Sequence, residues 1–483
     1  MFGGIWDTGR AGAGEMLPPI PRSASRRGFL HLSERMVVDL LALADIAIVA
    51  IAALVAKFIY ITLFLESDQA PHSYLVAGLL GGTLVYYTAR NYGLHEASAI
   101  LNWRERLYDM VLSVGTAFVL LLVIAFLFKI SKDYSRGWML TWFALSVGFV
   151  TLWRVVSTRI LHWLHATGST ARRIAVVTTD TCGDQVSEQL SKIPGVGVTG
   201  VFTLGREGDD TSATMQEIIA IGERNEIDEI IVAFSRPDER LASLVKELNV
   251  LPVHVWLHYA ELGLPISGAQ RLGPLNLLET RSRPICDWSY VSKTAFDYVV
   301  GTICVLVFTP IMLLIALAIR LDSPGPALFR QRRNGYNHRI IDVYKFRTMR
   351  VMEDGDAVRQ ASKDDDRVTA IGKFLRRTSL DELPQLFNVL RGEMSLVGPR
   401  PHALAHNDYY RHQIDSYALR HLVRPGITGL SQINGLRGGT EDPEMMARRV
   451  QTDLYYIEHW SLLMDIKIIA LTPFKGFINP NAY

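Results

Sequence analysis

The sequence predicts a membrane protein of mixed α and α/β class, with a four-helix transmembrane bundle, a Rossmann-like α/β module and a membrane-anchored C-terminal domain. Three observations support this fold class. Apolar residues make up 49% of the 483 residues, and the mean hydropathy of +0.16 is high for a soluble protein. Strand-like and helix-like segments alternate between residues 172 and 262. A long apolar stretch interrupted by a proline then precedes the last third of the chain.

Charge and cysteine content exclude several function classes. A net charge of +2 lacks the strong positive charge that is typical of nucleic-acid-binding proteins, so nucleic acid is not a predicted partner. The three cysteines share no disulfide or metal-ligand spacing, which is typical of a reducing compartment. The 13 histidines form no HExxH pattern, and a zinc site is therefore not predicted.

Residues 1–34 are rich in Gly, Pro, Ser and Arg and predict a disordered cytoplasmic N-terminus. Arginines precede the first apolar run, but no small-residue cleavage site follows a short apolar core. This pattern indicates a retained membrane anchor and not a signal peptide.

Four long apolar segments then predict a transmembrane bundle over residues 35–165. They cover residues 37–65, 74–89, 109–130 and 138–158. All except the second are comfortably long enough to span a bilayer. Asp45 lies inside the first segment and must face protein or water. Basic residues flank the N-terminus and fill the 90–106 loop but are absent from the 66–73 loop. The positive-inside rule therefore predicts a cytoplasmic N-terminus, to which four crossings return the chain.

Residues 171–265 predict a cytoplasmic Rossmann-like α/β module. Short apolar strands alternate with helices, the strands near 173–179, 197–202, 229–234 and 253–257 and the helices near 184–190, 215–225 and 238–248. This alternation is typical of a parallel sheet. A dinucleotide site would need a G-x-G-x-x-G turn after the first strand, but only Gly183 occurs there. A structural or regulatory role is favoured over nucleotide binding.

A fifth apolar stretch, Tyr298–Ile319, allows two interpretations. Thr309 and Pro310 lie at its middle, where a proline removes a backbone hydrogen bond and bends or breaks a helix. A proline-kinked crossing would place the rest of the chain outside the cell. A re-entrant helix-break-helix over residues 290–322 enters and leaves on one face and keeps the rest inside. The downstream motifs favour the re-entrant path.

The region after residue 323 is rich in basic motifs. Ala327–Met349 predicts a β-hairpin that turns at Asn334 and Gly335. Its basic side chains are Arg330, Arg332, Arg333, Lys345 and Arg347. Arg400 and Arg424 each lie in a loop rich in Pro and Gly. Each of these clusters could also be a solvated face or a patch for lipid headgroups.

The stretch Thr378–Leu390 carries an adjacent carboxylate pair, Asp381 and Glu382. Ser379 predicts a helix N-cap and Glu382, three residues later, completes a capping box, so the motif alone favours a structural role. The arginines that bracket this pair are Arg376, Arg377, Arg400 and Arg424. Beside a membrane, this combination instead suits phosphate chemistry, because carboxylates hold Mg²⁺ on a diphosphate while guanidinium groups bind its oxygens. An aspartate can also attack phosphorus.

The end of the chain, residues 453–483, predicts a helix that lies at the membrane interface. Its apolar run contains Tyr455, Tyr456 and Trp460, which suit the boundary between lipid and water. Asp465 lies within this run. It is either a paired site residue or a residue on an exposed polar face, and the sequence leaves both alternatives open.

Several short motifs occur in one order along this last third. They are Lys293-x-x-x-Asp297, Ser323-Pro-Gly-Pro, Lys345-Phe-Arg-Thr-Met, Leu380-Asp-Glu-Leu-Pro, Ser395-Leu-Val-Gly-Pro-Arg-Pro, Arg424-Pro-Gly-Ile-Thr-Gly and Ser461-Leu-x-x-Asp465. In this combination the chain resembles the bacterial sugar transferases, the polyisoprenyl-phosphate hexose-1-phosphate transferases of the monotopic phosphoglycosyl transferase superfamily. The resemblance is dense over residues 290–483. It is weaker over residues 1–262, where four spans and an α/β module are similar to the long-form members.

The resemblance implies a phosphoglycosyl transferase catalytic domain over residues 323–483 and a two-step reaction. Asp381 would attack the β-phosphorus of a UDP-sugar, giving a phosphosugar-aspartyl enzyme and UMP. Undecaprenyl phosphate would then accept the phosphosugar. Glu382 would hold Mg²⁺ against the diphosphate. The other implied candidates for binding substrate or its phosphates are Lys345, Arg376, Arg400, Arg424 and Asp465.

The resemblance also implies a multi-pass protein of the bacterial inner membrane, with its catalytic domain on the cytoplasmic face of the lipid bilayer. Pairing of two protomers through the α/β module is expected from long-form relatives. The motif that begins at Arg449 is similar to the glucose-1-phosphate branch of exopolysaccharide synthesis, so UDP-glucose is expected over UDP-galactose. A non-catalytic scaffold for polysaccharide assembly and a nucleotide sensor are the alternatives. The intact carboxylate pair weighs against the first, and the missing glycine loop weighs against the second.

Overall fold

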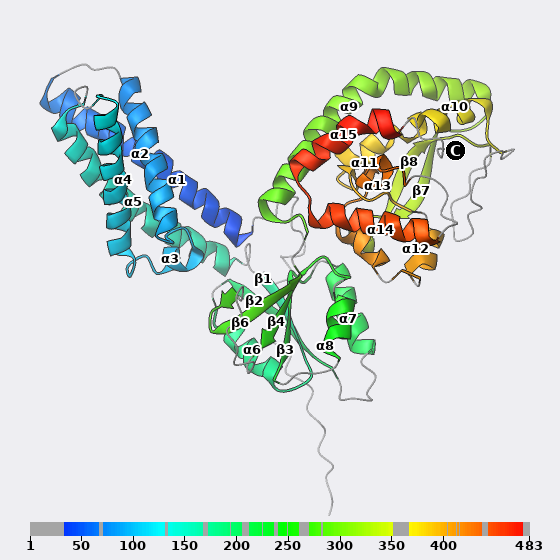
Figure 1. Ribbon diagram of the computed structural model, residues 1–483, viewed down its shortest axis with the longest axis horizontal. Helices are drawn as coiled ribbons and strands as arrows, with labels where there is room; N and C mark the ends of the chain where they lie inside the picture. The colour runs from blue at the N-terminus through cyan, green and yellow to red at the C-terminus, as the bar shows by residue number, and fades with distance from the viewer. Residues whose placement is uncertain are drawn as a thin grey trace, which may run out of the picture. The chain divides into compact units, whose positions relative to one another are not determined.

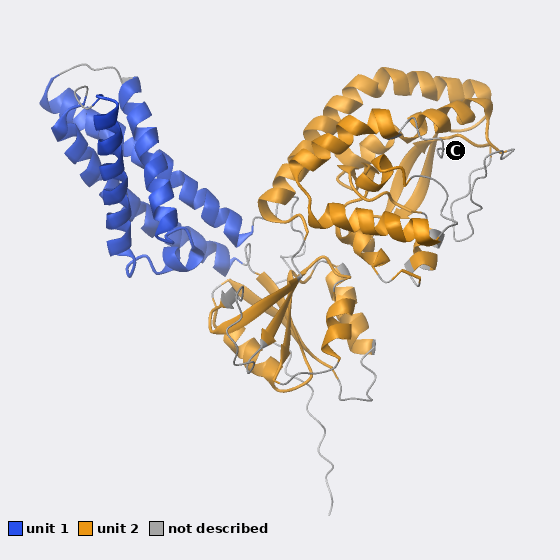
Figure 2. Ribbon diagram, viewed as in Figure 1, with its two compact units in different colours: residues 1–171 blue, residues 172–483 orange. Residues whose placement is uncertain are grey.

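A computed structural model shows the chain as two compact units, residues 1–171 and 172–483 (Figure 2). The described residues are 33–66, 71–130, 134–167, 172–193, 195–204, 212–224, 226–235, 240–248, 250–259, 270–281, 284–350, 367–402, 404–411, 413–414, 416–436 and 443–476. The N-terminal segment predicted to be disordered lies outside them, except Ser33 and Glu34, which begin the first helix. The predicted boundaries at residues 265, 290 and 323 fall within the second unit and stay predictions.

The first unit is a bundle of helices. Their bounds are α1 Glu34–Ala56 with its π-helical continuation η2 Lys57–Phe64, α2 Pro71–Asn91, α3 Ala97–Leu101, α4 Leu107–Leu127 and α5 Arg136–Ala166. α1 packs on α2 and α5, and α2 packs on α4. Trp138 and Trp142 of α5 are fully buried, and their indole N–H groups donate to the backbone carbonyls of Ala53 and Val49 on α1. These bonds fix α5 against α1.

Within the described part of the chain, four helices are long and apolar enough to cross a membrane. They are Glu34–Phe64, Leu107–Leu127, Arg136–Ala166 and Asp287–Asp322. The chain is therefore a membrane protein. Three of these helices belong to the bundle and match three of the predicted spans. α2 corresponds to the second predicted span and has 21 residues, but it is not among the four.

Asp45 is fully buried in the bundle and faces protein, one of the two predicted alternatives, and the structure shows that it is paired. Its Oδ2 lies 2.6 Å from Nη2 of Arg154 on α5 and 3.1 Å from Nε2 of His95, in the connection between α2 and α3. A carboxylate at this depth needs such partners, because an isolated charge in an apolar surrounding is costly.

The second unit begins with a six-stranded sheet in the order β2-β1-β3-β4-β6-β5. The strands are β1 Arg172–Thr178, β2 Val196–Thr203, β3 Glu229–Phe234, β4 His254–Tyr259, β5 Gln270–Leu272 and β6 Leu275–Arg281, and the helices are α6 Cys182–Ser191, α7 Ser212–Glu223 and α8 Leu241–Leu248. The first four strands are parallel, which confirms the predicted alternation. β5 and β6 add an antiparallel edge that the sequence did not predict.

α9 (Asp287–Asp322) is one helix of 36 residues that bends along its course (Figure 1). The predicted break at Thr309 and Pro310 is wrong in its local geometry, since the helix continues through both residues. Proline deletes one hydrogen bond and bends a helix without ending it when the neighbouring turns stay packed. The hydroxyl of Thr309 donates to the carbonyl of Val305 at 2.6 Å, a local bond that also favours bending. The re-entrant path through the membrane stays a prediction.

The rest of the second unit packs around α9. Its elements are β7 Leu328–Asn334, η3 Tyr336–His338, β8 Ile340–Phe346, α10 Ala370–Thr378, η4 Leu380–Glu382, α11 Gln385–Leu390, β9 Ser395–Val397, α12 Leu404–Arg411, η5 Tyr417–Leu422, β10 Gly426–Thr428, α13 Leu430–Ile433, α14 Pro443–Glu458 and α15 Leu462–Gly476. The predicted hairpin is confirmed as β7 and β8. The predicted C-terminal helix is two helices, because the chain leaves α14 before Trp460 and Ser461 Oγ accepts from Met464 N in the first turn of α15.

Candidate active site

Asp381 and Glu382 lie in the single turn η4, at a corner between α10 and α11. Ser379 before them has φ 54°, a left-handed conformation, and its side chain caps no helix. The predicted capping box is therefore wrong, and α11 begins only after Pro384. A left-handed backbone is costly for a residue with a side chain and is concentrated at functional sites. Here it ends α10 and turns the chain so that both carboxylates lie on one corner.

Glu382 is held by two cations from different segments. Nη1 of Arg400 donates to its Oε2 at 3.0 Å and Nη2 donates to its Oε1, a bidentate pair. Nζ of Lys345 on β8 donates to Oε1 at 3.0 Å. The Glu382 side chain is 7% exposed. The structure thus brings together three of the predicted site residues around one buried carboxylate.

Asp381 has a different environment from its neighbour. It is half-buried and accepts no hydrogen bond from a described residue. Burial raises the pKa of Asp381 to about 6, and the charge of Glu382 adds to this effect, although Lys345, Arg400 and Arg376 oppose it. Two carboxylates with different environments divide into different chemical roles. Glu382 is fixed, and Asp381 is available to react.

The cations around the pair are more numerous than the sequence predicted. Nη1 of Arg333 on β7 donates to the carbonyl of Pro401. Burial and the nearby charge of Arg400 together lower the pKa of Arg333 to about 10, although Glu382 opposes the shift. Burial likewise lowers the pKa of Lys345, although Glu382 opposes this shift. Because the cations here outnumber the carboxylates, they are suited to bind an anion.

Three residues that the sequence did not single out as site residues support Arg400. Arg420 is 3% exposed, pairs with Asp453 at 2.8 Å and donates to the carbonyl of Arg400 at 2.9 Å. Nη1 of Arg420 lies 3.0 Å from Nδ1 of His402, which must therefore be the unprotonated, accepting nitrogen. Asp453 lies in the motif that begins at Arg449, but no motif marks Arg420 or His402, because their partners lie far along the chain.

Arg424 was predicted to bind phosphate, but the structure places it away from the pair. Its Nη2 donates to the hydroxyls of Tyr290 at 2.8 Å and Thr294 at 3.0 Å, both near the start of α9. Its guanidinium also lies 5.1 Å from the centre of the Tyr290 ring. Among the contacts of the described residues, Arg424 links β10 to α9 and does not reach Glu382.

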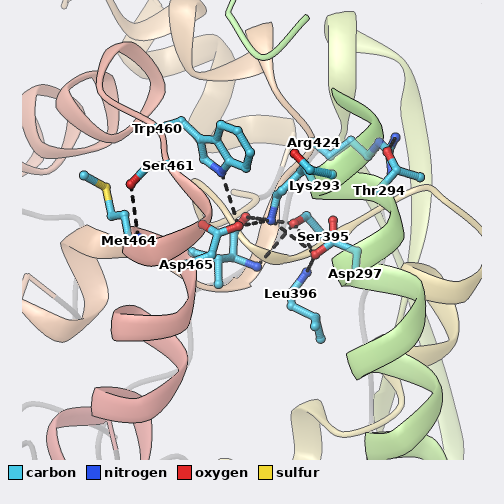
Figure 3. Close-up of polar contacts among 12 residues, drawn as sticks. Lys293, Thr294, Asp297, Ser395, Leu396, Arg424, Trp460, Ser461, Met464 and Asp465 are labelled. Carbon is cyan, nitrogen blue, oxygen red and sulfur yellow. Dashed lines mark hydrogen bonds and ion pairs between the residues drawn. The ribbon is translucent and has the colours of Figure 1, made fainter. Parts of the chain in front are cut away.

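Asp465 is fully buried in a separate polar cluster (Figure 3). Its Oδ2 accepts from Nζ of Lys293 at 2.7 Å and from Nε1 of Trp460 at 3.2 Å. Of the two alternatives that the sequence left open, the paired one is correct. The predicted contact with a substrate phosphate has no support in this arrangement, because a second anion would repel a phosphate and the carboxylate has no exposed surface.

The donor set of the carboxylate pair fits Mg²⁺ only when a substrate completes it. Among the described residues, no group of three or more His, Cys, Asp or Glu side chains could hold a metal ion. Mg²⁺ commonly takes one or two carboxylates together with substrate phosphates and water, and Asp381 and Glu382 meet that requirement. An ion on Glu382, as predicted, would have to share its oxygens with Arg400 and Lys345.

Comparison with known proteins agrees with this geometry. Residues 288–479 match the family described as bacterial sugar transferase. A UDP-glucose:undecaprenyl-phosphate glucose-1-phosphate transferase from Escherichia coli (strain K12) is 40% identical over 353 residues, which are 71% of this chain and 76% of that protein. The chain belongs to the bacterial sugar transferase family. This sugar transferase is therefore an enzyme, and the carboxylate pair is its candidate active site.

Two further relatives of the sugar transferase differ in the sugar that they are named for. A protein from Xanthomonas campestris pv. campestris, also named UDP-glucose:undecaprenyl-phosphate glucose-1-phosphate transferase, is 36% identical over 403 residues, 79% of this chain and 83% of its own. A UDP-N-acetylgalactosamine-undecaprenyl-phosphate N-acetylgalactosaminephosphotransferase from Aeromonas hydrophila is 40% identical over 180 residues, 37% of this chain and 42% of its own. The glucose-named relative matches along much more of the chain.

Residues 100–258 of the sugar transferase also match a family described as CoA-binding domain. In a sheet of this order, a phosphate ligand binds at the carboxyl ends of β1 and β3, where the strand order reverses, and at the N-terminus of the following helix. The carboxylate of Asp180 already lies there, accepting from the backbone N–H of Cys182 at 2.8 Å and of Ser235 at 3.0 Å. These described residues do not fit the phosphates of coenzyme A at that position.

Proposed function

We propose that this sugar transferase moves hexose-1-phosphate, with glucose as the hexose, from a UDP-sugar to undecaprenyl phosphate and releases UMP. The observation that carries the proposal is the asymmetry of the carboxylate pair. Asp381 accepts no hydrogen bond from a described residue, whereas Glu382 beside it is held by Arg400 and Lys345. A nucleophile next to a fixed cationic site is the arrangement that covalent phosphoryl transfer requires.

In the first step, a carboxylate oxygen of Asp381 attacks the β-phosphorus of the UDP-sugar. The bond between this phosphorus and the bridging oxygen breaks, and UMP leaves with the electron pair. In the second step, a phosphate oxygen of undecaprenyl phosphate attacks the same phosphorus. The bond to Asp381 breaks, and the carboxylate is regenerated for the next cycle. Neither step needs an oxidant or a further co-substrate.

The cations around Glu382 bind and orient the transferring group. Arg400 and Lys345 provide positive charge next to Glu382, and Arg376 acts on the charge of Asp381. Mg²⁺, held by the carboxylate pair together with the substrate, would neutralise charge on the diphosphate. Because these groups are fixed before substrate arrives, little reorganisation is needed during the reaction.

The proposed substrates require an active site at a membrane surface, since one is water-soluble and the other is a lipid. α9 is apolar and long enough, at about 54 Å, to enter a bilayer with a hydrocarbon core of about 30 Å. We place the protein in the bacterial inner membrane, with its catalytic residues on the cytoplasmic face. In that placement α9 follows the re-entrant path, and the product serves exopolysaccharide assembly.

Glucose is chosen over galactose because relatives from Escherichia coli and Xanthomonas campestris, matched over most of their length, are named for glucose. The two sugars differ only in the orientation of one hydroxyl group. No contact among the described residues distinguishes the two sugars. Measurement of the transferred sugar therefore tests the choice of glucose.

The test incubates the purified protein with undecaprenyl phosphate, Mg²⁺ and each of UDP-glucose, UDP-galactose and UDP-N-acetylgalactosamine, and measures UMP. We expect UMP release with UDP-glucose, dependent on undecaprenyl phosphate for multiple turnovers. A phosphohexose adduct on the peptide that contains Asp381, detected by mass spectrometry without the lipid, would support the covalent step. No UMP with any sugar would reject the transferase activity and favour the non-catalytic scaffold.

A further inference from the structure

We propose that Lys293 and Arg420 are positioning residues that hold the segment Ser395–His402, so that Arg400 meets Glu382. This inference rests on the proposed function, because it assigns how that site is aligned. Most of the segment lacks regular structure, since only its first three residues form β9. It is held at both ends by buried ion pairs that have no contact with Asp381 or Glu382 themselves.

Lys293 of α9 holds the start of the segment (Figure 3). Its three ammonium hydrogens have three acceptors: Asp465 Oδ2 at 2.7 Å, the carbonyl of Val397 at 3.1 Å and Asp297 Oδ1 at 3.2 Å. Lys293 is 6% exposed and both carboxylates are almost fully buried. A buried charge that is bonded to several partners fixes geometry strongly, because moving any one of them leaves the charge less compensated.

Asp297 also bonds directly to the start of the segment. Its Oδ1 also accepts from the backbone N–H of Leu396 at 3.1 Å and the hydroxyl of Ser395 at 3.0 Å. The hydroxyl of Tyr456 lies 3.0 Å from the Val397 carbonyl and 2.8 Å from Asp465. Residues from α9, α14 and α15 therefore meet on the three residues that begin the segment.

Arg420 holds the other end. Its Nη2 donates to the carbonyl of Arg400 itself, Nη1 meets His402 and Nε pairs with Asp453. The guanidinium lies 5.3 Å from the centre of the Tyr417 ring, which covers one of its faces. Each of its three nitrogens thus donates to an acceptor, and its position determines where the backbone of Arg400 lies.

The alignment matters because the bond between Arg400 and Glu382 is bidentate. A bidentate guanidinium needs both nitrogens in register with both oxygens, and a small shift of its backbone loses one of the two bonds. The room for adjustment is small at Gly398, where a Cβ would approach the Arg424 carbonyl to 2.5 Å. The segment is therefore closely packed at Gly398, and buried ion pairs hold each of its ends.

Two variants test the two ends of the segment. Arg420→Lys keeps the positive charge beside Asp453, but its single nitrogen cannot reach partners that are spread over the three nitrogens of a guanidinium. The triple variant Lys293→Met with Asp297→Asn and Asp465→Asn removes the three buried charges together and leaves no lone charge in the core. Arg448→Lys and Lys467→Met, at exposed positions on α14 and α15, are the matched controls. A single melting transition establishes that each variant is folded.

The first readout is hydrogen exchange of the backbone amides of residues 395–402, which requires no activity. We expect exchange about tenfold faster in both test variants and unchanged in the controls. The second readout is the kcat for UMP release. We expect a loss of about tenfold in each test variant, but less than about twofold further loss when Arg400 is already Lys, because a residue that acts through Arg400 has nothing left to align.

The inference is overturned if exchange is unchanged in both variants, or if it rises with kcat unaffected. It is equally overturned if the losses multiply with that of Arg400→Lys, since the residues would then act independently. If the native protein releases no UMP with any sugar, the proposed function fails, and hydrogen exchange alone still decides whether Lys293 and Arg420 hold the segment.

Discussion

Arg400 donates to both carboxylate oxygens of Glu382, while Asp381, the preceding residue, accepts no hydrogen bond from a described residue. Two adjacent acidic residues therefore differ in their hydrogen bonds and in their charge environment. A bidentate guanidinium fixes one carboxylate and lets it orient cations around the site. The other keeps its lone pairs for chemistry. This division of roles carries the first three predictions.

Asp381→Asn should abolish turnover and raise thermal stability. The amide cannot form the phosphoester bond, so we expect kcat for UMP release to fall by at least about 10³-fold. The raised pKa of Asp381 shows that its ionised form is unfavourable in the folded protein, and a neutral side chain removes that cost. We therefore expect a higher Tm. Asp342→Asn, at an exposed position of β8, should change neither quantity. A variant that retains turnover would contradict the covalent step.

The pH dependence of turnover should follow Asp381. Its pKa is raised to about 6, so the carboxylate is protonated and not nucleophilic below that pH. We expect kcat/KM, which reports the ionisation of the free enzyme, to fall tenfold per pH unit below about 6. The ionisation of Asp381 also affects stability. Because its pKa is higher in the folded protein than in the unfolded chain, protonation of Asp381 favours the folded state. This contribution to the free energy of unfolding is present at low pH and is lost as the pH rises through about 6.

Arg376→Gln gives a control for this assignment. Arg376 lowers the pKa of Asp381, so its removal should move the midpoint of the kcat/KM profile to higher pH. Arg448→Gln, exposed on α14, should leave the midpoint in place. A midpoint near 4, or one that Arg376→Gln does not move, would assign the ionisation to another group.

Arg400→Lys should separate charge from geometry. Lysine keeps the positive charge but cannot make the bidentate bond to Glu382. Loss of one charge-assisted bond predicts a fall in kcat/KM of roughly 10- to 100-fold. Arg448→Lys, which makes no ion pair among the described residues, should behave as the native protein. Equal activity of Arg400→Lys and the native protein would mean that charge alone is needed.

The sequence predicted the elements whose signals are local. Alternating apolar strands and amphipathic helices give the four parallel strands β1 to β4 because each segment carries its own periodicity. Asp45 in an apolar span required a buried partner, and the structure supplies Arg154. The strand pair β5 and β6 was missed, since β5 has only three residues and shows no periodicity.

The site was predicted only in part because its contacts are long-range. The local pattern at Ser379 is that of a capping box, but packing of η4 imposes a left-handed residue there instead. Lys293 and Asp465 are 172 residues apart, and no local pattern could show that they pair. The resemblance implied that Arg400, Arg424 and Asp465 bind substrate, and this stays a prediction. The structure adds that Arg400 contacts Glu382, whereas Arg424 and Asp465 contact residues of α9.

Coenzyme A should not bind to the α/β module at the end of β1. Burial by itself would raise the pKa of Asp180, but the N–H groups of Ser235 and Cys182 outweigh it and hold the pKa below its usual value. An anion in that place would repel a phosphate. We expect no change in Tm with added coenzyme A. Asp180→Ala should lower the free energy of unfolding by about 2 kcal/mol by leaving two N–H groups without an acceptor. A saturable increase of Tm with coenzyme A would reject this assignment.

In the buried ion pair of the bundle, Asp45 with Arg154, removing one charge should cost more stability than removing both. Asp45→Leu leaves Arg154 as a lone buried charge, and we expect a loss of about 3–5 kcal/mol and a lower Tm in detergent. Adding Arg154→Met removes that charge and should recover most of the loss, short of the bond to His95. Asp109→Asn breaks the exposed pair with Arg106 and should cost less than about 1 kcal/mol. If the double variant is no more stable than Asp45→Leu, the cost comes from lost packing and not from the uncompensated charge.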